Sequence, residues 1–131
     1  MAKENFGAVQ TFKAAGDYSD YQYCAVYISS ADTVTRSGAG GIVNGILLNK
    51  PTAAGRPAEV LTANGCFCKL KAATGISVGA ALEADASSRG VTVTIGTPGT
   101  TATYMIGWAN EASTADDDHI TVLTNFAPIN K

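Results

Sequence analysis

Charged residues are scarce in this chain of 131 residues. They make up 15% of the sequence, against about 25% in a typical soluble protein, whereas 46% of the residues are hydrophobic. Much of the surface must therefore consist of serine, threonine, asparagine, glycine and alanine. Such a surface suits close packing against other protein subunits better than it suits an isolated monomer.

Clusters of basic residues are absent as well. The 9 lysines and arginines stand singly along the sequence, and the formal net charge is -2. Proteins that bind nucleic acid usually group their cations so that these face the phosphates. We therefore expect no nucleic-acid partner.

Long apolar runs are also missing. The longest strongly aliphatic run is Ile46 to Leu48, far below the ~18 residues needed to cross a bilayer. The opening M-A-K-E-N-F has neither the apolar segment nor the cleavage site of a signal peptide. We expect no membrane partner, and the odd number of cysteines, 3, then favours reduced thiols.

Catalytic motifs do not occur. His119 is the only histidine, so a Ser-His-Asp triad or an imidazole base would have to use it. The glycine-rich segment 37–41 has no G-K-[ST] continuation, and Asp116 to Asp118 offer too few spaced oxygens for a calcium cage. We expect no enzyme activity, no cofactor, no metal and no small-molecule substrate.

Two of the cysteines form a C-x-C pair, Cys66 and Cys68. A disulfide between them is excluded on a strand, because residues i and i+2 lie about 6.5–7 Å apart and a disulfide needs Cβ atoms ~3.8 Å apart. Core packing is the favoured interpretation. A metal site, which would need Cys24 and His119 to converge on the pair, and a reactive thiol remain as alternatives.

The dipeptide Asn64-Gly65 precedes this pair and stands between two strand-like runs. It is the strongest short-range signal for a type I′ hairpin. The expected register pairs Leu61 with Cys68, which places both cysteines on the more apolar face of the hairpin.

What the sequence does contain is a series of short segments rich in valine, threonine, isoleucine and tyrosine, separated by glycine and proline turns. This pattern predicts an all-β fold, a small antiparallel barrel or sandwich of about seven or eight short strands, with at most one short helix. We find no convincing internal repeat. We expect an extended N-terminal arm over 1–20, the β-barrel domain over 21–126 and a C-terminal tail over 127–131.

Apolar residues on an arm and on strand rims are candidates for contacts between proteins. On the arm they are Phe6, Val9 and Phe12. Candidates for an interface between subunits are Tyr21, Tyr23, Tyr27 and Trp108.

The segment from Gly45 to Val60, G-I-L-L-N-K-P-T-A-A-G-R-P-A-E-V, is followed by I-S-V-G-A-A-L-E and by G-W-A-N-E-A. This order resembles the β-barrel capsid decoration, or head cement, proteins of bacteriophages. The residues that match the family's pattern are Gly45, Asn49, Pro51, Gly55, Val60, Gly79, Leu82, Gly107 and Ala109. The resemblance covers roughly residues 42–125 and rests mainly on glycines and small residues.

The resemblance implies a homotrimer that binds the major capsid protein on the outside of the virion and clamps neighbouring capsid subunits, after synthesis in the host bacterial cytoplasm. The low charge, the missing catalytic residues and the apolar arm agree with it. Alternatives are another phage structural subunit, such as a tail-tube, head-completion or fibre-base protein, and a small metal-binding or ligand-binding barrel.

Overall fold

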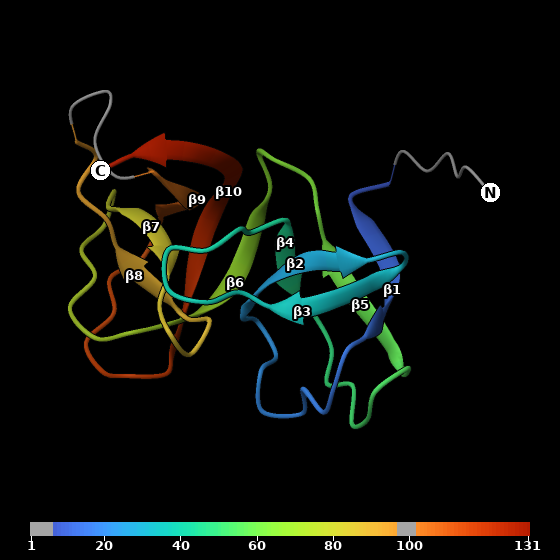
Figure 1. The fold of residues 1–131 in the computed structure, drawn as a ribbon. Coiled ribbons are helices and arrows are strands. Elements are labelled where there is room, and N and C mark those ends of the chain that lie inside the picture. The colour runs from blue at the N-terminus through green and yellow to red at the C-terminus, as the bar shows by residue number, and fades with distance from the viewer. Residues whose placement is uncertain (1–6, 97–101) are drawn as a thin grey trace.

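The computed structural model describes residues 7–96 and 102–131 and contains ten strands in two closed, five-stranded sheets that lie side by side (Figure 1). The N-terminal barrel consists of β1 (Val9–Ala14), β2 (Ala25–Ser30), β3 (Thr33–Arg36), β4 (Gly45–Leu47) and β5 (Pro57–Leu61). The C-terminal barrel consists of β6 (Phe67–Ala72), β7 (Ala81–Ala84), β8 (Gly90–Thr92), β9 (Ala102–Ala109) and β10 (Asp118–Asn130).

The predicted all-β class is confirmed, but the arrangement differs from the expectation. The strands close two small barrels instead of one, and two of the strand pairs are parallel, β1 with β3 and β6 with β8. The described residues contain no helix, so none of their elements is a helix long enough to span a membrane.

The two barrels have the same topology. Around the N-terminal barrel the order is β1, β3, β2, β4, β5, and around the C-terminal barrel it is β6, β8, β7, β9, β10. The parallel pair joins the first and third strands in each, and every antiparallel pair of one barrel has its counterpart in the other. The chain is therefore an internal structural repeat, which the sequence analysis did not find.

The repeat extends to single residues in the fourth and fifth strands. Ile46 pairs with Leu61 in the N-terminal barrel, and Trp108 pairs with Leu123 in the C-terminal barrel. The residue before each, Gly45 or Gly107, has no room for a side chain, because an added Cβ would press on the carbonyl oxygen of the opposite leucine. The same three residues, V-L-T, stand at 60–62 and at 122–124.

Unusual backbone angles also recur at corresponding places. Tyr23 (φ 65°) and Gly79 (φ 84°) precede the second strand of each barrel, and Asp32 (φ 56°) and Ser88 (φ 66°) precede the third. The Tyr23 N–H donates to Leu47 O over 2.6 Å, and the Gly79 N–H donates to the corresponding carbonyl in β9 over 2.7 Å. The repeated features belong mostly to the backbone, which explains why side-chain patterns did not reveal them.

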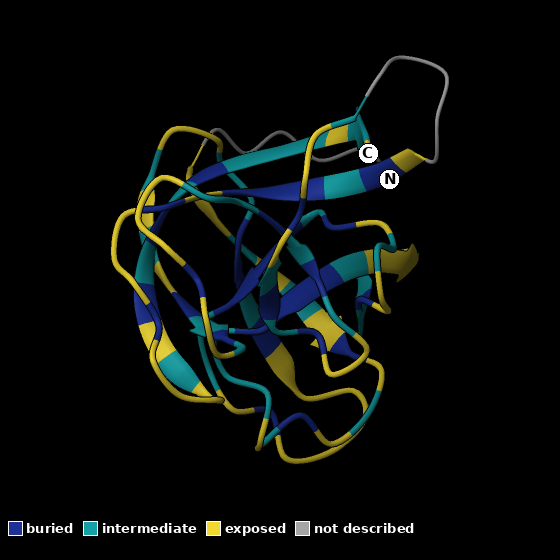
Figure 2. Ribbon diagram, turned by 90° about the vertical axis from the view of Figure 1, so that its left-hand side faces the viewer, coloured by how far each residue is buried: buried dark blue, intermediate teal, exposed yellow. Residues whose placement is uncertain are grey.

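The core has two parts, and its buried residues lie mainly along the strands, whereas the exposed residues gather in the outer loops (Figure 2). One fills the N-terminal barrel and includes Val26, Leu47 and Val60. The other fills the C-terminal barrel and also takes in Ala25 and Ile46, which lie on the outside of the N-terminal barrel and are 0% exposed. The second barrel therefore covers apolar surface that the first barrel leaves outside.

The hairpin expected at Asn64-Gly65 is wrong. Strand β5 pairs with β1 and β4, whereas β6 pairs with β10 and β8, so the dipeptide connects two barrels. Gly65 has the expected positive φ of 76°. The Gly65 N–H donates to Thr124 O, and the Asn64 side chain accepts from the Phe126 N–H, both over 2.8 Å. The dipeptide is therefore bonded to β10.

The two sheets extend beyond both ends of the expected barrel domain. Residues 9–14, which the sequence analysis placed in the arm, form β1 between β3 and β5. Residues 127–130, expected in the tail, continue β10 beside β9. The alternation of apolar and polar residues is weak in both segments, and the pairing partners supply most of their order.

The residues that carry the family resemblance have structural roles in this fold. The Asn49 side chain spans the loop between β4 and β5, donating to Pro57 O and accepting from the Glu59 N–H, both over 3.0 Å. Val60 and Leu82 are buried, and Gly79 opens β7 with its positive φ. A pattern of small residues therefore reports on backbone geometry.

The three cysteines are free thiols. Cys24 is 0% exposed, and Cys68 is half-buried against the core of the C-terminal barrel. Burial raises the pKa of the Cys24 thiol to about 11, and burial, with a smaller effect from the neighbouring Cys66, raises the pKa of Cys68 to about 11. These two side chains therefore pack as neutral groups.

The close approach at the repeated glycines predicts a large loss of stability for Gly107→Ala. The new Cβ would collide with main-chain atoms of Leu123, which cannot move without shifting β10. We expect the free energy of unfolding to fall by about 3 kcal/mol and Gly45→Ala to behave similarly. Gly38→Ala is the matched control, because its Cβ would meet nothing within 4 Å. Chemical denaturation measures all three, and equal midpoints would contradict the repeat's steric basis.

The buried thiols predict a loss of stability at alkaline pH. Thiols in the unfolded chain have a pKa of about 8.5. Below this pH, the thiols are neutral in the folded and in the unfolded chain, and their burial stabilises the fold in full. Between that pH and about 11, the unfolded chain loses protons first, so the free energy of unfolding falls. Urea denaturation at pH 8 and pH 10.5 should show a smaller fall for Cys24→Ala than for the native chain. An identical fall would contradict the assignment to this thiol.

Candidate binding surfaces

Tyr23 joins the two barrels. Its N–H donates to Leu47 O in the N-terminal barrel over 2.6 Å, and its carbonyl accepts from the Lys71 N–H in the C-terminal barrel over 2.8 Å. Its ring meets the His119 ring edge-on, with centroids 5.3 Å apart. Next to it, the Ala25 N–H donates to Ser88 O over 2.8 Å.

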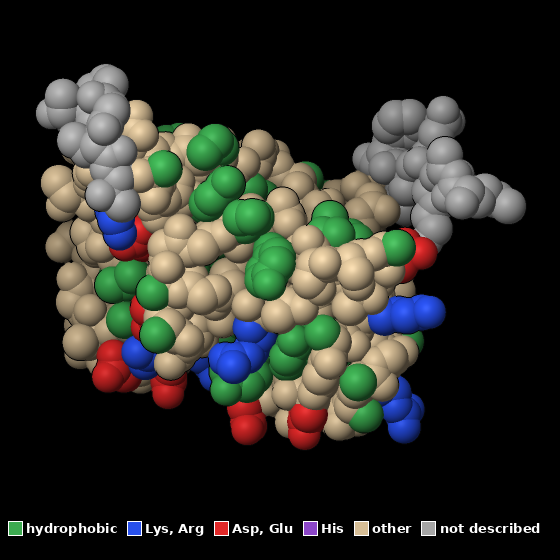
Figure 3. All heavy atoms as spheres, in the orientation of Figure 1, with side chains coloured by type: hydrophobic (Ala, Val, Ile, Leu, Met, Phe, Trp, Pro, Cys, Tyr) green, Lys and Arg blue, Asp and Glu red, His purple; other side chains and the backbone are tan. Residues whose placement is uncertain are grey.

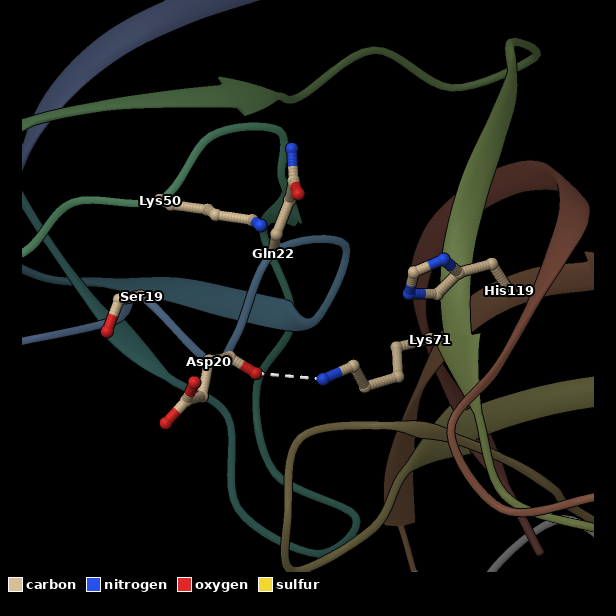
Figure 4. Close-up of a pocket in the computed structure, with 6 residues that line it drawn as sticks. All are labelled: Ser19, Asp20, Gln22, Lys50, Lys71 and His119. Carbon is tan, nitrogen blue, oxygen red and sulfur yellow. Dashed lines mark hydrogen bonds between the residues drawn. The ribbon is translucent and has the colours of Figure 1, made fainter.

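A pocket of about 220 Å³ opens beside this joint (Figure 4). It is lined by Ser19, Asp20, Gln22 and Lys50 from the N-terminal part of the chain and by Lys71 and His119 from the C-terminal barrel. Lys71 Nζ donates to Asp20 O over 2.8 Å, while the carboxylate of Asp20 points away from Lys71. Among the ion pairs of the described residues, none involves Lys50 or Lys71.

This pocket can attract an anionic group, but it does not assemble a catalytic set. The Ser19 hydroxyl donates to Asp17 over 2.7 Å, so it is not activated by His119, which lies across the opening (Figure 4). The lysines stand in an open, hydrated site, where charge attraction is strongly screened.

The three aspartates after β9 bond to protein groups. Asp116 accepts from the Thr74 N–H over 3.0 Å, and Asp117 forms an ion pair with Arg89 at 3.2 Å. Asp118 accepts from two main-chain N–H groups, which hold the pKa of its carboxyl below the usual value. No three histidine, cysteine or acidic side chains in the described ranges are grouped as metal ligands would be, and the cysteines and His119 do not converge.

An apolar row crosses the outside of the C-terminal barrel. Phe67 on β6 pairs with Leu123 on β10, which pairs with Trp108 on β9. Directly opposed residues share one face of a sheet. Phe67 is 67% exposed and Trp108 40% exposed. Of these three residues, only Trp108 was predicted from the sequence as a contact residue. Phe67 comes close to it through the long-range pairing of β6 with β10.

A second, more apolar pocket of about 270 Å³ lies on the N-terminal barrel. Its lining residues are Thr11, Phe12, Lys13, Asp32, Gly55 and Pro57. Phe12 is half-buried and packs against the core of this barrel. Phe12 therefore lines the pocket from a strand of the barrel and does not project freely from an arm.

The other predicted contact residues are placed as follows. Phe6 lies outside the described residues, and Val9 is 42% exposed at the start of β1. Tyr21 lies under Arg36, 3.9 Å from its guanidinium, and Tyr27 is half-buried on β2. With Tyr23 at the joint and Trp108 on the opposite barrel, these side chains do not form one continuous surface.

The surface itself carries little charge. In the face drawn in Figure 3, hydrophobic side chains lie among uncharged ones, and most of the acidic and basic groups lie along the lower edge. Much of the positive charge of Arg89 and Lys131 is already paired, with Asp85, Asp117 and Glu83. This face offers shape and apolar contact more than charge.

The sequence was compared with known proteins. A family model described as phage cement protein matches residues 16–125, a range that includes strands of both barrels. No curated protein sequence matches the chain. Because the family model covers most of the sequence, the chain belongs to the phage cement proteins, structural proteins that associate with capsid proteins in the virion.

Proposed function

We propose that this protein binds the outer surface of a phage capsid and stabilises the shell by clamping neighbouring subunits of the major capsid protein. The match to the phage cement family over both barrels carries this proposal. The low charge of the chain agrees with a structural role.

The segment that leads into β1 is the proposed contact with the shell. Strand β1 is fixed to β5 from Val9 onward, and the preceding Ala8 O accepts the Thr62 N–H over 3.0 Å. Residues in front of this point thus start from a rigid anchor, close to the exposed Val9. A short segment of this kind can add main-chain pairing and an apolar side chain, here Phe6, to a partner.

The homotrimer is part of the same proposal. Several copies of one weak contact raise the overall affinity, because the second and third contacts form at high effective concentration. Trp108 and Tyr27 are the proposed subunit contacts among the earlier candidates, since Tyr21 and Tyr23 already pack within their own chain.

Removing the leading segment tests the proposed shell contact. We expect deletion of residues 2–6 to lower binding to capsids that lack the protein by at least about tenfold, with the melting temperature unchanged because β1 is retained. Co-sedimentation with purified capsids measures the bound fraction.

Within this segment, Phe6→Ala should reproduce most of the loss, and Asn5→Ala is the matched control. If the deletion variant occupies capsids as fully as the native chain, the segment is not the contact.

A further inference from the structure

The joint between the barrels consists of a docking segment and a socket. The docking segment is Tyr23 to Ala25, which belongs to the N-terminal barrel. The socket lies on the C-terminal barrel, where Lys71 and Ser88 bond to this segment and His119 meets the tyrosine ring at 5.3 Å. Because the two barrels repeat, both parts have counterparts elsewhere in the molecule.

The counterpart of the socket lies on the N-terminal barrel. Val9 pairs with Leu61, and Phe67 pairs with the corresponding Leu123, so Val9 and Phe67 are counterparts. Four residues further along each strand, Lys13 is therefore the counterpart of Lys71. Asp32 and Ser88 both have a positive φ and both precede the third strand of their barrel, so they are counterparts. Pro57 and His119 are as far apart in the sequence as the two V-L-T segments, so Pro57 is the counterpart of His119. Lys13, Asp32 and Pro57 all line the apolar pocket of about 270 Å³.

This socket has its own features. Its Lys13 N–H donates directly to Asp32 O over 2.6 Å, in the place where the docking segment separates Lys71 from Ser88. A visiting segment therefore finds these two main-chain groups already bonded to each other, and its side chains can contact the pocket at Phe12 and Pro57.

The counterpart of the docking segment lies on the C-terminal barrel and is exposed. Gly79 corresponds to Tyr23 by its φ and its bond to the fourth strand, and Ala81 corresponds to Ala25. Trp108 pairs with Ala81 as Ile46 pairs with Ala25. Ile46 is 0% exposed because the C-terminal barrel covers it, whereas Trp108 is 40% exposed. Beside Gly79, Val78 is 69% exposed.

We propose that these two surfaces bind each other between two copies of the chain. The face around Ala81 and Trp108 of one copy docks on the Phe12–Pro57 pocket of the next. The two faces correspond to the docking segment and the socket, but the contact is made by side chains, because Lys13 and Asp32 already bond to each other. The proposal deepens the proposed self-association and rests on it. The occupant is a second copy because these two faces correspond in the fold to the pair of faces that is joined inside each chain.

Such a contact is head-to-tail, since it uses two different faces of each copy. Contacts of this type close into rings when the rotation between copies permits it. In a closed trimer, N-terminal and C-terminal barrels would alternate around the ring. An interface in which the apolar row faces itself would give a two-fold pair and would leave the pocket unused.

Two variants separate the surfaces. Trp108→Glu disables the docking face and Pro57→Glu disables the pocket, both at exposed positions. Asn110→Glu and Thr52→Glu are matched controls that add the same charge at exposed residues outside both surfaces. Val78→Glu gives a second docking-face variant in a loop, so that a fold defect in Trp108→Glu does not decide the outcome. Light scattering over a wide concentration range measures the mass.

We expect the native chain and both controls to associate, and each docking or pocket variant to associate at least tenfold more weakly. An equimolar mixture of Trp108→Glu and Pro57→Glu should form a heterodimer and nothing larger, because one intact contact remains. Trp108 is the only tryptophan, so its emission should shift to the blue on association of the native chain.

Three results would overturn the proposal. If Pro57→Glu associates as the native chain does, the pocket is not involved, although self-association stands. If the mixture forms no heterodimer, the contact is not head-to-tail. If the native chain stays monomeric at every concentration, neither surface binds a second copy, and capsid co-sedimentation still tests the shell contact separately.

Discussion

The main chain of Tyr23 is the point on which the two-barrel arrangement depends. Its φ of 65° is unusual for a tyrosine and costs on the order of 1–3 kcal/mol. The conformation lets one residue donate to Leu47 and accept from Lys71, so that it is bonded to both barrels. Its counterpart Gly79 has the same bond within its barrel and a similar φ without the strain of a side chain. The strained Tyr23 therefore lies where the two barrels are joined. The unstrained Gly79 lies at the corresponding place of the C-terminal barrel, where no further barrel of the chain is joined.

This joint also completes the core. Each barrel has roughly 60 residues, a size at which a domain buries only about 60% of its unfolded surface and is marginally stable. The N-terminal barrel is filled by side chains such as Val26, Leu47 and Val60. Its outward-facing Ala25 and Ile46 become buried only when they join the core of the C-terminal barrel. The two halves thus share apolar surface, and a change that separates them would expose part of the larger core cluster.

The sequence was sufficient for the fold class and for the small residues that shape the backbone, but not for the strand partners. Along Phe67 to Ala72, the face that carries Cys68 was correctly predicted to be the more apolar one, and it packs against the core. The Asn64-Gly65 turn was read as a hairpin because that signal is local, whereas β5 and β6 find their partners in different barrels. Strand β1 shows little alternation in its composition. The apolar row and the pocket beside Phe12 both depend on long-range register, which no short sequence pattern reports.

The repeat explains why similar barrels can have different tasks. Backbone features such as the close approach at Gly45 and Gly107 are retained in both, because the fold requires them. The outward side chains at matching positions differ: Ile46 is small enough to be covered by the second barrel, and Trp108 at the same position is left exposed. Trp108 lies in one apolar row with Leu123 and Phe67, and contiguous apolar patches mark interaction sites more than single exposed residues do. A phage cement protein associates with capsid proteins. An outer face that remains apolar after the chain has used its counterpart internally is therefore a suitable surface for contact with another subunit.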